Sequence, residues 1–208
     1  MKLRIFCLII CFFFSWVSSL AQEKIYFTQN EIGLLFGKGE EQWDGSSERR
    51  VDFTLQTFHG AWIGKKQVIG FSAGLDQYDD ISLIPLAMGW RGFLGKSGGP
   101  QFFGGLDLGA STALLEKKVR TEWQESWYEG GAMVSPSLGA RFPSKQGKSS
   151  LSFTLAYKRQ DLTYFEGTLN GGGIIFPDNI GDIPGEFNSL FRSESIFHSL
   201  IFRAGLMF

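Results

Sequence analysis

The last ten residues, 199-SLIFRAGLMF-208, alternate in character at every position. Successive side chains of a β-strand point to opposite faces, so each parity of this stretch describes one face of a strand. One face is apolar and could meet lipid; it carries Leu200, Phe202, Ala204, Leu206 and Phe208. The other is mixed, small and charged and could line a closed sheet; it carries Ser199, Ile201, Arg203, Gly205 and Met207.

The same two-residue period recurs upstream and predicts seven further strands. No segment shows a convincing apolar period of 3.6 residues, which a helix would require. Most segments are about 10 to 15 residues long, whereas a tilted membrane strand needs about 9–11 residues and soluble strands usually have about five or six. The eight expected strands are Lys24–Phe36, Arg49–Ile63, Gln67–Asp76, Ile81–Leu94, Gln101–Ala113, Gly130–Phe142, Ser149–Gln160 and Glu194–Phe208.

The amino terminus has the pattern of a secretory signal peptide. Two basic residues precede the apolar run Ile5–Val17, and the small residues Ser19 and Ala21 suit cleavage before Gln22. The run is shorter than the roughly 20 apolar residues that span a membrane as a helix. We therefore expect residues 1–21 to be removed and residues 22–208 to form one domain. Both cysteines lie in the predicted signal, so the mature chain would have no thiol chemistry.

Charge composition argues against nucleic acid as a partner. The predicted signal carries two of the 20 basic residues and none of the 21 acidic ones, so the mature chain has 18 against 21 and a net charge of −3. A protein that binds nucleic acid usually carries a broad basic surface. No nucleic-acid partner is therefore expected.

Charged residues concentrate on the parity opposite to the apolar face. A Lys or Arg that faced lipid at mid-bilayer depth would cost about 2–4 kcal/mol, whereas charges inside a barrel can pair with one another. We interpret them as a structural polar network, with a narrow ion or proton path as the alternative. The predicted interior charges are Glu31, Asp52, Arg91, Asp107, Arg141, Lys158 and Arg203.

Three segments, together with the two ends of the chain, resemble a known family. They are Ile84–Arg91, Pro100–Gly109 and Gly131–Phe142, and the set resembles the small outer-membrane β-barrel domain family of Gram-negative bacteria. The nearest architecture is an eight-stranded transmembrane barrel of the OmpA type. The last strand also resembles the sorting signature of such barrels, which implies an assembly signal at Phe202, Leu206 and Phe208. The resemblance implies lipid and the barrel-assembly machinery as partners, and a monomer.

Connection lengths agree with this architecture. The connections after the second, fourth and sixth strands are short and the others are longer on average, as expected for short periplasmic turns and long external loops. The two longest, Leu114–Glu129 and Asp161–Ser193, are candidates for contact with an extracellular ligand. They could equally fold over the barrel mouth or extend the last hairpins. The aromatic residues singled out in them are Trp123, Trp127, Tyr128, Tyr164 and Phe176.

Catalytic and metal-binding motifs are weak. His198 has outward parity near the end of the last strand, but the hydroxyls of Ser195 and Ser199 point the other way, which leaves a partner from an adjacent strand open. His59 points outward without an acid at compatible spacing. The pair Asp79-Asp80 offers too few oxygens for calcium. We therefore predict no catalytic residue, no cofactor and no metal site.

These observations together predict an all-β fold, an eight-stranded antiparallel up-and-down transmembrane β-barrel in the outer membrane. The expected role is structural, or surface interaction through the external loops, without catalysis. One alternative is an enzyme that modifies lipid A or phospholipid of the outer leaflet. The other is a soluble lipocalin-like carrier, in which the apolar parity would face inward.

Overall fold

The computed structural model describes residues 25–41, 47–78, 81–96, 98–113, 118–144, 149–169 and 187–208. Within these residues there are nine strands and no helix. The predicted signal peptide, Asp79-Asp80 and Phe176 lie outside them. The strands are β1 (Tyr26–Glu41), β2 (Ser47–Gly64), β3 (Gln67–Gln77), β4 (Ser82–Leu94), β5 (Gln101–Thr112), β6 (Val119–Arg120), β7 (Gln124–Pro143), β8 (Ser150–Leu169) and β9 (Phe187–Met207).

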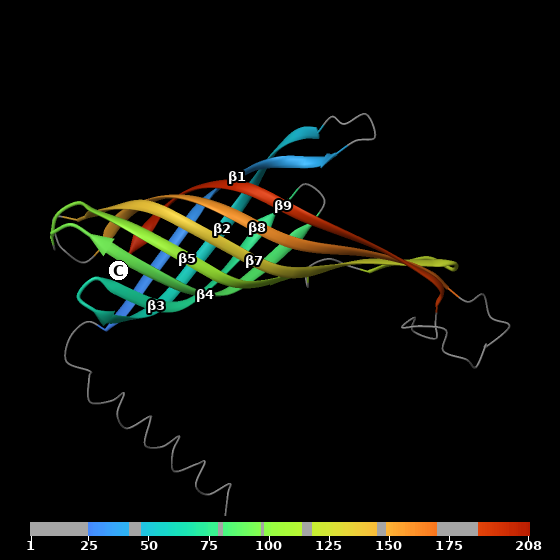
Figure 1. The fold of residues 1–208 in the computed structure, drawn as a ribbon, viewed down its shortest axis with the longest axis horizontal. Coiled ribbons are helices and arrows are strands. Elements are labelled where there is room, and N and C mark those ends of the chain that lie inside the picture. Colours follow the sequence, from blue (N-terminus) through green and yellow to red (C-terminus); the bar gives the residue numbers. More distant parts are fainter. Residues whose placement is uncertain are drawn as a thin grey trace, which may run out of the picture.

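The strands form one antiparallel sheet that closes on itself (Figure 1). The order is β5-β4-β3-β2-β1-β9-β8-β7-β6, and an additional pairing of β5 with β7 completes a ring of eight of the described strands. The two-residue strand β6 pairs only with β7 and lies outside the ring. The predicted all-β, antiparallel class is confirmed, and each ring strand lies beside its neighbours in sequence except where the first and last strands meet.

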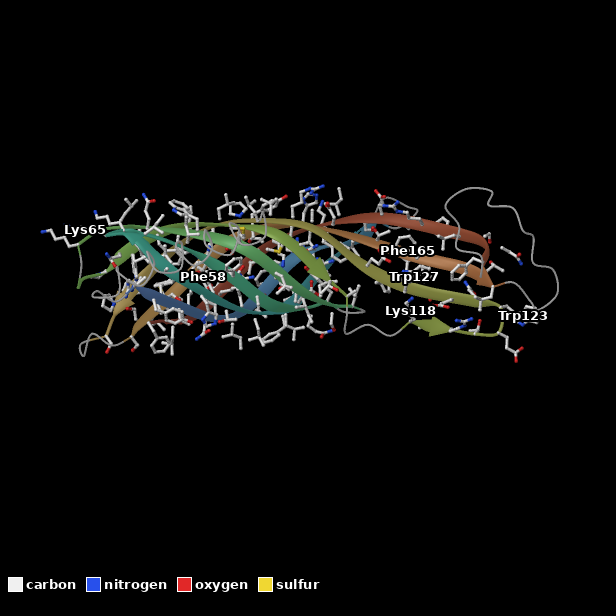
Figure 2. All side chains as sticks on the ribbon, turned by 90° about the horizontal axis from the view of Figure 1, so that it is seen from below. Phe58, Lys65, Lys118, Trp123, Trp127 and Phe165 are labelled. Atoms are coloured by element: carbon white, nitrogen blue, oxygen red, sulfur yellow. The ribbon has the colours of Figure 1, made fainter. Side chains whose placement is uncertain are left out.

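The predicted parity is also confirmed by burial. Along β8, every second side chain from Ser150 to Lys158 is buried and those between are exposed. In β9 the apolar parity is exposed, while Ser199, Ile201 and Arg203 are buried. Figure 2 shows side chains projecting from the outside of the ring along its length. Along these two strands, apolar residues such as Leu155 and Phe202 are therefore on the outside, and the charged residues Lys158 and Arg203 are inside.

Three strands are much longer than the sequence predicts. Residues 161–169 continue β8, residues 187–193 begin β9, and residues 124–129 begin β7, although all three segments were expected to lie in connections. Beyond the ring, β7, β8 and β9 pair with one another in register, and they project from one end together with β6 (Figure 1). We call this part, residues 119–129, 163–169 and 187–194, the extension. The expected ends of these three strands are wrong, because hydrogen bonding continues past the point where the apolar alternation stops. Of the possibilities left open for the two long connections, the described residues show the extension of the last hairpins.

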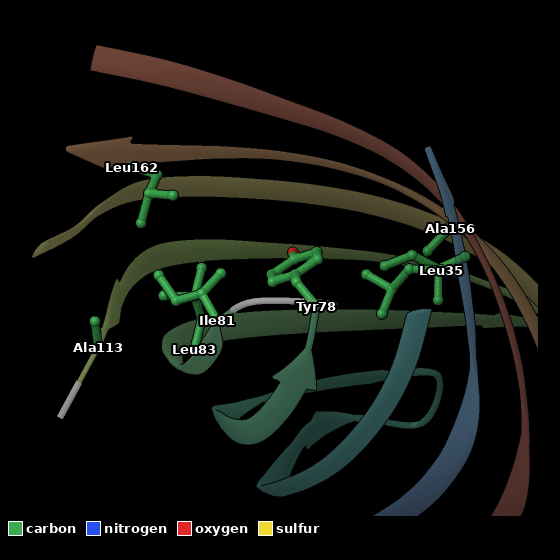
Figure 3. Packing of buried hydrophobic residues seen from close by; sticks show 8 residues of the cluster. Leu35, Tyr78, Ile81, Leu83, Ala113, Ala156 and Leu162 are labelled. Atoms are coloured by element: carbon green, nitrogen blue, oxygen red, sulfur yellow. The ribbon is translucent and has the colours of Figure 1, made fainter. Parts of the chain in front are cut away.

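The interior of the ring has three layers. At the end with short turns, an aromatic cluster fills it: Phe27, Phe58, Val68, Phe93, Phe103 and Met207, with Trp62 packed against them. At the end with long connections, Figure 3 shows a second apolar cluster: Leu35, Tyr78, Ile81, Leu83, Ala113, Ala156, Leu162 and Ile201. The charged side chains lie between the two. Trp62, whose parity predicted an inward position, packs inward beside a register shift of β2.

Candidate functional site

The central layer of the ring is an electrically balanced polar network. Its buried members among the described residues are four acids, Glu31, Asp52, Asp76 and Asp107, and four bases, Arg50, Arg91, Lys158 and Arg203. Six of the seven predicted interior charges are in this set. The sequence reasoning missed Arg50 and Asp76. Both lie on the inward parity of their strands: Arg50 is two residues before Asp52 on β2, and Asp76 is near the end of β3.

Arg91 and Asp107 form the best-oriented pair of the network. Arg91 donates from Nη1 to Asp107 Oδ1 at 2.8 Å and from Nη2 to Asp107 Oδ2 at 2.9 Å, a bidentate arrangement. Arg91 Nε donates to Gln29 Oε1 at 3.3 Å, and its guanidinium lies 4.4 Å from the ring centroid of Phe58. Gln56 Nε2 donates to Asp107 Oδ2 at 2.9 Å. The pair is thus tied to the aromatic layer on one side and to the remaining network on the other.

Gln56 links this pair to a second chain of contacts. Arg203 donates to Gln56 Oε1 and, at 3.2 Å, to Thr54 Oγ1. Thr54 Oγ1 in turn donates to Asp76 Oδ1 at 2.7 Å, and Lys158 donates to Asp76 Oδ2. Strands β2, β3, β8 and β9 are therefore joined across the interior by side chains as well as by their backbones.

Two further acids complete the layer. Glu31 Oε1 accepts from Thr154 Oγ1 at 2.5 Å and from Ser152 Oγ at 3.2 Å, so hydroxyl groups of β8 hold a carboxylate of β1. Asp52 pairs with Arg50, which also donates to Ser199 Oγ at 3.2 Å. The Arg50 guanidinium lies 4.6 Å from the ring centroid of Tyr78.

Tyr78 lies just past the end of β3, and its ring covers the Arg50 guanidinium of the network. Burial and, second, the neighbouring Asp76 carboxylate raise the pKa of the Tyr78 phenol above its ordinary value. The phenol therefore stays protonated, and its neutral ring caps the charged layer.

Arg141 is the predicted interior charge that does not join the layer. It is half-buried near the short-turn end, where Nε donates to Ser150 Oγ at 2.9 Å. Its guanidinium lies 5.7 Å from the ring centroid of Phe93. Arg141 therefore closes the rim of the aromatic cluster.

The residues of the predicted assembly signal form an outward row along β9 and its end, where β9 pairs with β1 and closes the ring. Phe202, Leu206 and Phe208 are 54%, 45% and 52% exposed. The backbone N–H of Phe208 donates to the Thr28 carbonyl at 2.9 Å, so the last residue is hydrogen-bonded to the first strand. The aromatic ring of Phe208 thus sits on the outer surface at the short-turn end.

The predicted partner-contact residues that the structure describes, Trp123, Trp127, Tyr128 and Tyr164, lie in the extension. Trp123 is exposed in the connection between β6 and β7, at the far end of the extension (Figure 2). Trp127 stacks on Phe165 with ring centroids 5.1 Å apart and an interplanar angle of 9°. Tyr128 and Tyr164 contact each other on the opposite face, with centroids 5.0 Å apart. These contacts hold the extension together, whereas Trp123 is 66% exposed.

Lys118 and Arg192 add cations to the face of the extension that carries Trp127. Lys118 Nζ lies 5.0 Å from the Trp127 ring centroid, and the Arg192 guanidinium lies 5.8 Å from that of Phe165. Aromatic and arginine side chains are the types that most often anchor protein partners. This face is therefore the best candidate contact surface of the extension.

Both histidines hydrogen-bond hydroxyl groups on the outside of the ring. The partner of His198 comes from an adjacent strand, which the sequence had left open, whereas the partners of His59 were not predicted. Tyr157 on β8 bonds His198 Nδ1, and Tyr26 on β1 bonds His59 Nδ1. Thr57 Oγ1 lies 2.8 Å from His59 Nε2. The signal for the last contact was present, because Thr57 lies two residues before His59 on the same face. The two tyrosines are cross-strand neighbours that only the register reveals.

No described group of three or more His, Cys, Asp or Glu side chains is arranged to hold a metal ion. Among the described residues there is likewise no helix long and apolar enough to cross a membrane. Comparison with known protein families gives no matching family model, and comparison with curated proteins gives no match either.

Proposed function

We propose that this protein is an integral outer-membrane β-barrel that crosses lipid with the eight strands of the ring and presents the extension outside the membrane. Its role in this proposal is structural or interactive, without catalysis. The resemblance to the small outer-membrane β-barrel family suggests the compartment. The predicted signal peptide agrees with it.

One observation carries the proposal, namely the exposed apolar surface of the ring. Large apolar side chains such as Phe71, Phe102 and Leu138 are 66%, 72% and 70% exposed, and every ring strand contributes to this surface. Soluble monomers rarely expose a contiguous apolar patch of more than a few hundred Å². In lipid the same surface is favourable, and a closed ring leaves no unpaired strand edge there.

The inverse arrangement inside the ring supports the same proposal. Some buried charges form ion pairs, such as Arg91–Asp107 and Lys158–Asp76, and others, such as Glu31 and Arg203, bond polar side chains. Both arrangements avoid the cost of exposing a charge to hydrocarbon. A soluble lipocalin-like carrier would require apolar residues lining the interior along its length and a polar exterior. The observed distribution of residues argues against that alternative.

The filled interior argues against a wide pore. Apolar clusters occupy both ends, and a void lined by Gln56, Ser135, Lys158 and Arg203 has a volume of about 10 Å³. A water molecule needs a void of at least about that size and two to four polar partners. We therefore propose a structural role for the network in place of an ion path.

The test is a membrane fraction run on a detergent gel without and with boiling. A folded barrel resists the detergent, so the unboiled sample should migrate faster and shift on heating. The protein should also remain in the outer-membrane fraction after washing with carbonate. A soluble protein without a shift would contradict the proposal.

An outer-leaflet lipid-modifying enzyme is the second candidate. The contact between the Tyr157 hydroxyl and His198 Nδ1 favours it, because a base within reach of a hydroxyl is the arrangement that activates a nucleophile. Mass spectrometry of lipid A and phospholipid from cells with and without the gene tests it. A modified lipid that disappears with His198→Ala would replace the non-enzymatic proposal.

A further inference from the structure

We propose that a strip of basic side chains on the outside of β1, β2, β8 and β9 binds the phosphate of an anionic membrane lipid. The strip consists of Lys38, Arg49, Arg159 and His198. This inference rests on the proposed membrane function and adds to it a binding site and the chemical class of its ligand.

The register places the four side chains in adjacent positions. Lys38 is the direct cross-strand partner of Arg49, and Arg159 is the direct partner of His198. The carbonyl oxygen of His198 lies 2.9 Å from the position of a Cβ on Gly37, the residue before Lys38, which brings the two pairs together across the seam. Lys38, Arg49 and His198 are exposed, and Arg159 is half-exposed.

The strip borders the apolar surface directly. Two residues further into the ring on the same four strands lie Phe36, Val51, Leu200 and Tyr157, which pair with one another in one continuous row. Two residues of a strand span about 7 Å. The cations are therefore one side-chain row beyond the apolar surface, the depth at which lipid headgroups begin in a barrel that spans a bilayer.

Electrostatics favour an anion at this place. Like charges directly opposite each other on two strands are destabilising, and Lys38 and Arg49 are such a pair. Among the side chains that the structure describes, no carboxylate pairs with either of them. Arg159 Nη1 contacts Asp161 Oδ1 at 3.0 Å, which leaves the rest of the guanidinium available. His198 Nδ1 bonds the Tyr157 hydroxyl, so Nε2 is the ring nitrogen through which His198 could bind an anion.

A groove beside the strip provides an independent reason to expect a lipid. It has a volume of about 460 Å³ and is lined by Ile32, Leu34, Phe36, Leu155, Leu200 and Phe202. Ligand pockets are commonly about 300–1,000 Å³ in volume and mostly apolar. Phe36 and Leu200 belong both to the groove and to the row next to the strip. An acyl chain in the groove would place its headgroup at the cations, and guanidinium and ammonium groups both bind phosphate.

The experiment compares two lipids on the folded, detergent-solubilised protein by native mass spectrometry. The probes are phosphatidylglycerol and phosphatidylcholine with identical acyl chains, and the variant is Lys38→Gln with Arg49→Gln. The matched control is Lys65→Gln with Lys66→Gln, which removes the same charge from the exposed turn at the opposite end of the ring. A gel without and with boiling reports on barrel folding for every variant.

We expect wild type and control to retain phosphatidylglycerol preferentially, and the strip variant to lose roughly fivefold in preference for each cation removed. Equal preference in the strip variant and wild type, or an equal loss in the control, would overturn the site while leaving the barrel intact. A wild type that neither shifts on heating nor associates with membranes would overturn the proposed function itself and the site with it.

Discussion

Asp107→Ala should destabilise the folded protein by roughly 3–5 kcal/mol, the usual cost of leaving one member of a buried ion pair without its partner. The Arg91 and Asp107 side chains are each 3% exposed, so water cannot replace the missing carboxylate. The substitution removes two charge-assisted hydrogen bonds at 2.8 and 2.9 Å, each worth about 1.5–3 kcal/mol. It also leaves Gln56 without an acceptor.

The double variant Arg91→Met with Asp107→Leu removes both charges. It therefore distinguishes the interaction between the two side chains from their contacts with other residues. Replacement of a buried ion pair by apolar residues of similar volume is often neutral. We therefore expect the double variant to recover most of the loss, with a coupling free energy of about 2–3 kcal/mol between the two positions. Additive losses would refute the view that the two charges stabilise mainly each other.

The assay is unfolding by denaturant in lipid vesicles, followed by tryptophan fluorescence and by the gel shift on boiling. The matched control is Glu194→Ala, which breaks an exposed ion pair. Arg192 Nη2 and Glu194 Oε1 are 2.6 Å apart, and the two side chains are 59% and 66% exposed. Exposed pairs contribute about 0–1 kcal/mol. A control loss as large as that of Asp107→Ala would show that burial in the ring is not what makes the central pair important.

Three other outcomes follow from the structure. Gly205→Ala should weaken the folded protein by about 1–3 kcal/mol in the same unfolding assay, because its Cβ would lie 2.0 Å from the Asn30 carbonyl oxygen. Gly64→Ala is the control, since no atom lies within 4 Å of that Cβ; equal losses would contradict the explanation. Trp127→Ala should remove about 0.5–1.5 kcal/mol of stacking on Phe165 and speed proteolysis of the extension while the gel shift persists; unchanged cleavage would argue against the stack as its support. In planar bilayers the wild type should show no stepwise conductance, and regular single-channel steps would refute a filled interior.

The sequence was sufficient to predict the strands and faces of the ring because the two-residue period is strong there. The parity of Arg203 and Phe202 follows from counting alone. The period also held the information for Arg50 and Asp76, which lie on the inward parity but at the ends of apolar runs. The extension was only one of several possibilities for the two long connections, for a different reason: its residues lack the apolar alternation, and pairing between Trp127 and Phe165 depends on register.

The interior apolar layers could not be derived from alternation. Phe27, Phe58 and Phe93 lie on the inward parity, yet an isolated phenylalanine has the same appearance in a sequence whether it faces lipid or fills a core. The contacts of the histidines were hidden similarly. Tyr26 and His59 are 33 residues apart and meet only through the register of β1 with β2.

The pairing of β1 with β9 at the seam of the ring can form only after the last strand has been synthesised, so ring closure is a late step of folding. Gln29 pairs with Met207, 178 positions later, so the first strand to leave the ribosome waits for the last one. Bringing such distant segments together carries a large loop-closure entropy and is slow. Until β9 arrives, β1 and β8 each have an unpaired edge that a neighbouring chain could occupy. A chain interrupted anywhere before Phe187 would keep both edges open, so closure of the ring itself distinguishes finished from unfinished molecules.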